Sequence, residues 1–191
     1  MAVIYDSKKT AQAVIDEVIN EADISLYITI PTYIRWLNAL EQSIYGSIVK
    51  GTVKETVKGA NGKIPASKAV EDITAIYVGP DALAKVSAEL LPLMSNDNFY
   101  AISNGNVLTN YGDVDFDVYY TERPTLKTEV NYKTETVKLP VEFLELVYCK
   151  LRGEAYKLAN EDGLAAKWLA DYNAQIADFA AWHEARKGYG E

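Results

Sequence analysis

The segment KGTVKETVKGANGKIPASK, residues 50–68, marks the point at which the residue pattern changes from helical to strand-like. Before it, residues 31–48 carry apolar side chains at the spacing of a helix. Within it, residues 52–58 place their valines and their lysines on alternating positions, as in a strand with one buried face. The sequence GANG at 59–62 follows as a turn. The segment therefore predicts a lysine-bearing hairpin arm that begins directly after a helix.

Two helices are expected before this segment. In the first, Asp6 or Ser7 can cap the N-terminus, and apolar side chains then recur at helical spacing as far as about Glu21. The second begins near Pro31, because proline suits the first turn of a helix, and it ends where Gly51 appears. Each apolar stripe covers only one face, so both helices need neighbours against which to pack.

A second helical block follows Pro140. Residues 143–158 carry one apolar stripe, and residues 164–179 carry another after an interruption by NEDG at 160–163. These stripes are also one face wide. We therefore expect the C-terminal helices to pack on one another or on the N-terminal pair.

The middle third of the chain reads as strands. Strand-like stretches occupy 72–79, 98–103 and 113–121, and NGN at 104–106 predicts a tight turn between two strands. The stretch 81–91 is ambiguous, and we expect a helical turn there. Together these stretches indicate a small antiparallel β domain.

The order helices, strands, helices predicts an α+β protein. The simplest arrangement that buries every stripe is a helix bundle formed by the N- and C-terminal helices, with an antiparallel β domain inserted in the middle. We assign residues 1–49 and 139–191 to the bundle, and residues 50–138 to the inserted β domain with its lysine-rich arm.

Charge is distributed unevenly along the chain. The net charge is −8 at pH 7, yet residues 50–68 contain five of the 19 basic residues and one of the 27 acidic residues, which leaves −12 for the rest. A surface of that charge repels a phosphate backbone, so general nucleic-acid binding by the whole protein is excluded. The candidate docking or DNA-facing residues are the lysines of the segment: Lys50, Lys54, Lys58, Lys63 and Lys68.

The sequence lacks the residue combinations of a catalytic or cofactor site. His183, the only histidine, is expected at the surface of the last helix, and Cys149 is the only cysteine, so neither a histidine-based catalytic set nor a zinc site is predicted. Residues 59–63 are not a phosphate-binding loop, because that motif requires glycine at Val57 and serine or threonine at Ile64. We expect a protein that is not an enzyme and that has no catalytic, cofactor-binding or metal-binding residues.

Three aspartates, at 113, 115 and 117, imitate the first ligands of a calcium loop. Such a loop needs glycine at its sixth position and glutamate at its twelfth, where this chain has Val118 and Pro124. The aspartates alternate with apolar residues, so we interpret them as the solvated face of a strand.

The sequence predicts no membrane segment, because no window approaches 18 uncharged apolar residues. The start, MAVIYDSKK, lacks the apolar run and small-residue cleavage site of a secretory signal. A single cysteine fits a reducing compartment. We expect a protein that is synthesised in the cytoplasm and does not bind membranes.

Three stretches resemble the head–tail connector proteins of tailed bacteriophages, also called adaptor or head-completion proteins. The stretches are YIRWLNALEQSIYGSIV (33–49), DITAIYVGPDALAKVS (72–87) and LPVEFLELVYCKLRGEAYKLANEDGLAAKWLADYNAQI (139–176). The first resembles the family's Trp-Leu-Asn helix, the second a strand and the segment after it, and the third the closing pair of helices. The β region is longer than in the simplest adaptors and is similar to that of the elaborated podovirus-type versions.

This resemblance implies a structural virion protein of the phage neck, made in the host cytoplasm. Its partners would be the portal protein, tail or tail-completion proteins, and further copies of itself in a ring, typically of twelve. Packaged DNA would pass through the ring without sequence-specific binding. The family has no catalytic residues, and an acidic body would let DNA slide.

Several alternatives remain open from the sequence. The lysine arm can meet a phosphate backbone or an acidic patch on the portal, or it can be a solvated hairpin whose charges protect an edge strand. The 14 tyrosines suit an interface, or they are half-buried strand residues. Another neck or tail component, such as a tail terminator, is one alternative function. A monomeric cytoplasmic protein-binding module is the other, and it predicts a compact monomer with largely buried tyrosines.

Overall fold

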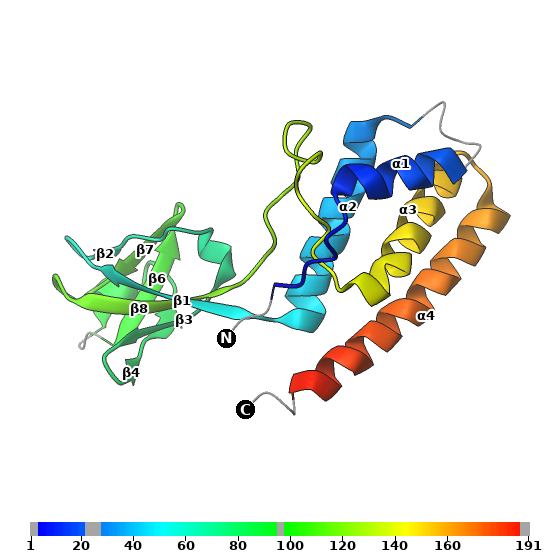
Figure 1. Ribbon diagram of the computed structural model, residues 1–191. Coiled ribbons are helices and arrows are strands. Elements are labelled where there is room, and N and C mark those ends of the chain that lie inside the picture. The colour runs from blue at the N-terminus through cyan, green and yellow to red at the C-terminus, as the bar shows by residue number, and fades with distance from the viewer. Residues whose placement is uncertain (1–3, 22–27, 95–97, 188–191) are drawn as a thin grey trace. The chain divides into compact units, whose positions relative to one another are not determined.

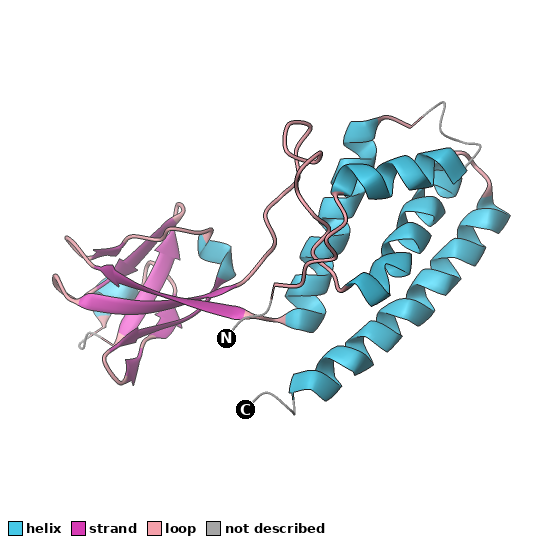
Figure 2. Cartoon of the chain, viewed as in Figure 1, coloured by secondary structure: helices cyan, strands magenta, loops and turns pink. Residues whose placement is uncertain are grey.

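The computed structural model describes residues 4–21, 28–94 and 98–187, and it confirms the α+β class (Figure 1). The residues divide into two compact units. The β unit is Lys50–Glu122, and the helical unit joins the described residues up to Val49 to those from Arg123 onward. Helices from both ends of the chain thus form one unit, and the segment between them folds as the other (Figure 2).

The β unit ends earlier than we expected from the sequence. Residues 123–138 belong to the helical unit, so the boundary lies at Glu122 rather than at 138. The reason is backbone pairing with the N-terminal segment: the N–H groups of Ser7 and Ala11 donate to the carbonyls of Val137 and Glu135 at 3.1 and 2.9 Å. Contacts so distant in sequence leave no periodic pattern.

The helical unit contains α1 (Ala11–Glu21), α2 (Ile30–Ile44), the π turn η2 (Tyr45–Val49), the 3-10 turn η5 (Val141–Phe143), α3 (Leu144–Leu158) and α4 (Asp162–Lys187). All four expected helices are present. The cap of α1 was predicted wrongly: the Oγ1 atom of Thr10, rather than Asp6 or Ser7, accepts a hydrogen bond from the Ala13 N–H at 3.2 Å. Pro31 lies in the first turn of α2, as predicted.

Helix α3 is the centre of the helical unit, and it contacts α1, α2 and α4 (Figure 1). Its Leu146, Val147 and Leu151 are fully buried, as is Phe179 of α4. The predicted interruption at 160–163 is confirmed as a turn. Asn160 has a φ of +60°, and its N–H and that of Glu161 donate to the carbonyls of Lys157 and Tyr156, which is a Schellman ending of α3.

The β unit contains β1 (Thr52–Lys58), β2 (Lys63–Ile64), η3 (Val70–Asp72), β3 (Ile73–Val78), β4 (Asp81–Ala82), β5 (Ala84–Val86), η4 (Leu91–Leu93), β6 (Phe99–Ser103), β7 (Asn106–Thr109) and β8 (Asp115–Thr121). One sheet has the order β1-β8-β3-β4 and the other β2-β7-β6-β5. All pairs are antiparallel except β5 with β6. Apolar residues of both sheets share one core, including Val107, Phe116 and Val118.

The expected turn at 104–106 is confirmed: Asn104 and Gly105, with φ of +51° and +73°, join β6 to β7. The helical turn expected at 81–91 is only partly confirmed. Strands β4 and β5 occupy 81–82 and 84–86, but the N–H groups of Leu90 and Leu91 donate to the Ser87 carbonyl at 3.1 and 3.3 Å, in a helical turn that leads into η4. The prediction that the lysines line a hairpin arm is wrong. Residues 52–58 do form a strand, but β1 pairs along its whole length with β8, whereas β2 pairs with β7 in the other sheet.

None of the helices in the described part of the chain is both long enough and apolar enough to cross a lipid bilayer.

Candidate interaction surface of the lysine segment

The five candidate lysines are spread over the β unit. Lys50 precedes β1 with a φ of +47°, Lys54 and Lys58 share the exposed face of β1, Lys63 is in β2, and Lys68 lies between β2 and η3. The side-chain alternation predicted for β1 is therefore correct. The lysines nevertheless do not line a single projecting arm, because β1 and β2 belong to different sheets.

Lys54 forms a cross-strand ion pair. Its Nζ lies 2.7 Å from Oδ2 of Asp117 on β8, and the Thr56 hydroxyl donates to Oδ1 of the same carboxylate at 2.7 Å. The hydrogen bond between them raises the pKa of Lys54 and lowers the pKa of Asp117. The charge of Lys54 is thus already partnered inside the sheet, which makes it the weakest docking candidate of the five.

The aspartates at 113 and 117 also take part in local structure. Asp113 accepts a hydrogen bond from the Asn61 N–H at 3.3 Å, and Asp117 is the partner of Lys54. Strand β8 buries Phe116 and Val118, which alternate with Asp115 and Asp117, as predicted. Within the described residues, no group of three or more histidine, cysteine, aspartate or glutamate side chains is placed to hold a metal ion.

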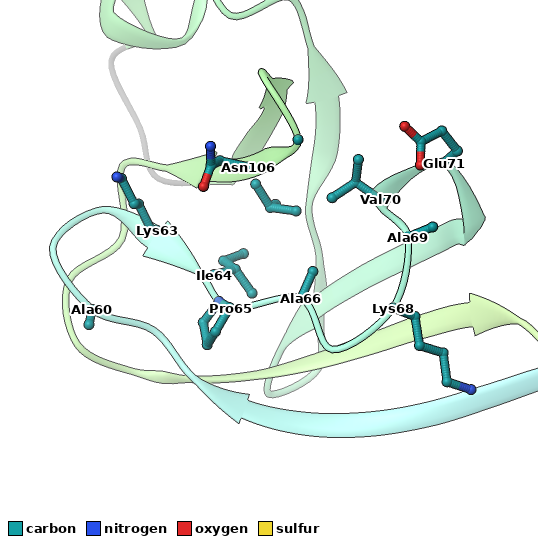
Figure 3. A pocket seen from close by; sticks show the side chains of 12 residues that line it. Ala60, Lys63, Ile64, Pro65, Ala66, Lys68, Ala69, Val70, Glu71 and Asn106 are labelled. Atoms are coloured by element: carbon teal, nitrogen blue, oxygen red, sulfur yellow. The ribbon is translucent and has the colours of Figure 1, made fainter.

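Lys63 and Lys68 lie on opposite sides of an open pocket of about 580 Å³ (Figure 3). Its lining includes the buried side chains of Ile64, Val70 and Val107, and Glu71 stands at a third side. The pocket forms because the chain leaves β2 at a proline and returns through η3 to the first sheet. The positive charges of the two lysines at its edges can attract a carboxylate or a phosphate oxygen.

Lys68 is held in place by an aromatic ring. Its Nζ lies 5.9 Å from the ring centroid of Tyr120, a distance at which a cation is attracted by the π face. The neighbouring Ser67 hydroxyl donates to the carboxylate of Glu55 on β1. Both contacts attach the segment between β2 and η3 to the first sheet, so this side of the pocket is fixed in position.

His183 is buried, contrary to our expectation of a surface position. Its Nδ1 lies 2.7 Å from the Tyr5 hydroxyl, and its Nε2 lies 3.3 Å from the carbonyl oxygen of Val49. The ring also stacks on Phe179 at a centroid distance of 6.1 Å. These contacts join the N-terminal segment, the end of η2 and α4. The histidine therefore holds these three parts of the helical unit together.

Sequence reasoning missed the most deeply buried charges of the helical unit. Lys127 donates through Nζ to the carboxylate of Glu41, and the two side chains are 0% and 1% exposed. A signal for Glu41 was present, because it stands beside Leu40 within the apolar stripe of α2. No sequence pattern indicated that Lys127 is buried, because it lies in an irregular segment without periodicity.

Most tyrosine side chains in the described ranges are packed within the fold. Tyr33, Tyr45 and Tyr120 are fully buried, and every other tyrosine in the described ranges is buried or half-buried. Their abundance therefore gives no separate support to an interface.

Comparison with protein-family models finds no family that matches this chain, and comparison with curated proteins finds no matching relative.

Proposed function

We propose that this protein is a head–tail connector of a tailed bacteriophage, a structural subunit that forms a ring between the portal and the tail. The observation that carries the proposal is the layout of the chain. Helices from both ends form one unit, and the intervening segment folds as a separate β unit. In this proposal the protein is not an enzyme, it acts in the virion neck, and packaged DNA passes through its ring.

The stretches that resemble the connector family fall on defined elements of this layout. Residues 33–49 are most of α2 and all of η2, residues 72–87 include β3 to β5, and residues 139–176 include η5, α3 and much of α4. The resemblance therefore involves both units. Their order along the chain supports the proposal more than any single residue does.

The open pocket between Lys63 and Lys68 is a candidate docking point. Lys63 and Lys68 are exposed on either side of it, and Lys58 is exposed on β1. The rest of the chain carries a net charge of −12. Within the proposed function, we assign these lysines to an acidic patch of the portal or to the phosphates of DNA at the channel.

A monomeric protein-binding module is the second candidate function. The observation that favours it is the burial of the tyrosines, which leaves the described units well packed without neighbours. It differs from the connector in predicting no recruitment to phage heads.

The test is light scattering on the purified chain, alone and after mixing with DNA-filled heads that carry the portal. A connector gives a ring alone, or about a dozen copies bound per head as the resemblance implies. A chain that stays monomeric and ignores the heads contradicts the proposal and favours the binding module.

The same assay tests the lysines. Changing Lys58, Lys63 and Lys68 to glutamine is expected to weaken binding to heads or retention of DNA, because the three positive charges assigned to docking are removed. The matched control changes Lys8, Lys85 and Lys133, which are exposed elsewhere, to glutamine. Equal binding by the two triple variants would rule out a role for the segment in docking.

A further inference from the structure

The tip of the segment between β8 and η5 is a rigid turn that exposes apolar side chains. The Asn131 side chain accepts from the Thr128 N–H at 2.6 Å and donates to the Leu126 carbonyl at 3.3 Å. The Thr128 hydroxyl in turn accepts from the Val130 and Asn131 N–H groups, each at 3.3 Å. Residues 126–131 are therefore ordered by their own hydrogen bonds.

Lys127 anchors this turn to α2. Besides the buried pair with Glu41, the Lys127 N–H donates to Oδ1 of Asn38 and its carbonyl accepts from Nδ2 of the same residue, both at 2.8 Å. A buried ion pair and two backbone hydrogen bonds thus fix the base of the turn. Little conformational entropy remains to be lost when the turn makes a contact.

The anchored turn presents Leu126 and Val130 to solvent, 56% and 88% exposed. Leu126 also lines a groove of about 410 Å³ together with Pro31, Ile34 and Arg35 of α2. We call Leu126, Val130 and this groove the tip patch. Exposed apolar side chains beside a groove can form a contact surface for a partner.

A second apolar patch lies at the turn between α3 and α4. Leu158 and Leu164, which the sequence placed on the buried stripes, are 58% and 44% exposed. They stand on either side of the Schellman turn at Asn160, so this patch is also rigid. We call Leu158 and Leu164 the turn patch. In Figure 1 the segment that joins β8 to η5 and the turn between α3 and α4 lie on different sides of the helical unit, with α2 between them in this view.

Charged side chains of both signs lie beside each patch. Arg35 and Glu129 line the groove of the tip patch. Next to the turn patch, exposed acidic and basic residues occur in pairs: Glu161 and Asp162, and Lys157 and Lys167. Arg35 can therefore face Glu161 and Asp162, while Glu129 faces the two lysines.

We propose that the tip patch of one copy of this chain docks onto the turn patch of a second copy. Because the patches differ and lie on different sides of one unit, each copy has one of each free for a further neighbour. Such a head-to-tail contact generates a closed ring when the rotation per copy closes. The inference rests on the proposed function, for which it supplies the subunit interface.

Disulfide trapping with the full-length chain tests this contact. The native Cys149 does not interfere, because it is buried and burial raises the pKa of its thiol to about 12. Val130→Cys and Leu164→Cys chains, mixed at high concentration under mild oxidation, are expected to form mixed dimers. A chain that carries both changes is expected to form a ladder of higher oligomers. The control mixture replaces Val130→Cys with Val141→Cys, a valine of the same unit that is 61% exposed.

A charge exchange adds a second measurement. Arg35→Glu is expected to lower the yield of mixed dimers about fivefold, the upper end for an exposed ion pair. Glu161→Lys with Asp162→Lys in the second chain is expected to restore it. Mixed dimers no more abundant than in the Val141 control, or Val130→Cys chains that pair with themselves equally well, would overturn the inference.

The trapping and head-binding experiments test different claims, so each can give a negative result without the other. Trapping uses the free chain, so mixed dimers without recruitment to heads keep the head-to-tail contact and remove the connector function. Recruitment to heads without mixed dimers keeps the connector and removes this interface.

Discussion

Lys127 and Glu41 form an ion pair in the interior of the helical unit, although they are 86 residues apart in the sequence. The other carboxylate oxygen of Glu41 accepts a hydrogen bond from the Lys138 N–H at 2.8 Å. Burial raises the pKa of Glu41, and the nearby ammonium of Lys127 opposes that shift. A single carboxylate thus fixes both ends of the segment from 127 to 138 onto α2.

Replacing Lys127 by methionine is expected to reduce the free energy of unfolding by about 3–5 kcal/mol, because it leaves the Glu41 carboxylate buried without its cation. Chemical denaturation measures the loss. The matched control is Lys133→Met in the same segment, an exposed position where the change is expected to stay within about 0.5 kcal/mol. A Lys127 variant as stable as the Lys133 variant would show that the pair is not buried in solution.

Tyr5 and His183 are expected to be energetically coupled. Tyr5→Phe and His183→Phe both keep an aromatic ring but remove the 2.7 Å hydrogen bond between the two side chains. A double-mutant cycle on unfolding free energies should give a coupling of about 0.5–1.5 kcal/mol. Tyr111→Phe provides the control, since its hydroxyl bonds the exposed Asn98 in the other unit. If the changes in unfolding free energy caused by Tyr5→Phe and His183→Phe are additive, the hydrogen bond makes no contribution to stability.

Glu17 is expected to contribute to acid sensitivity. A hydrogen bond from Lys9, 2.5 Å from its carboxylate, and then one from Tyr148 lower its pKa below the ordinary value of 4.5. A lowered pKa in the folded state stabilises the protein above pH 4.5, and this contribution is lost as the pH falls through the lowered pKa. Glu17→Gln should therefore be less stable than the parent at neutral pH.

The stability difference between Glu17→Gln and the parent should shrink as the pH is lowered below 4.5, because the parent carboxylate then becomes protonated. Urea unfolding at a series of pH values measures this difference. Glu142→Gln, at an exposed position, serves as the control. A difference that stays constant from neutral to acid pH would contradict the assigned role of Glu17.

Two glycines of the C-terminal helices are expected to respond to alanine with opposite sign. A Cβ at Gly153 of α3 would lie 2.7 Å from the Cδ2 atom of Leu169 on α4. Gly153→Ala should therefore cost about 1–3 kcal/mol through overpacking. Gly163, near the start of α4, has open space around such an atom, and its replacement should stabilise by about 0.4–1 kcal/mol. Thermal unfolding of the two variants distinguishes them, and stabilisation by both would contradict the close packing.

Much of the candidate site could not have been predicted, because its geometry depends on strand pairing. The alternation in residues 52–58 correctly placed Lys54 and Lys58 on one face of a strand. It contained no information on the partner strand, and the nearest candidate along the chain was the wrong one. The pairing of β1 with β8 joins Lys54 to Asp117, and the turn through η3 brings Lys68 opposite Lys63 around the pocket.

Local sequence patterns correctly identified the helices α1 to α4 and the strands β1, β3, β6 and β8, but not the short strands β4 and β5. Periodicity, Pro31 at a helix start, the turn at 104–106 and the interruption at 160–163 are all local, so neighbouring residues suffice to specify them. Tertiary structure alone decided the burial of His183 and Lys127, the domain boundary at Glu122 and the exposure of Leu158 and Leu164. Each of these depends on contacts between distant segments, which form only when the chain folds and which no local pattern records.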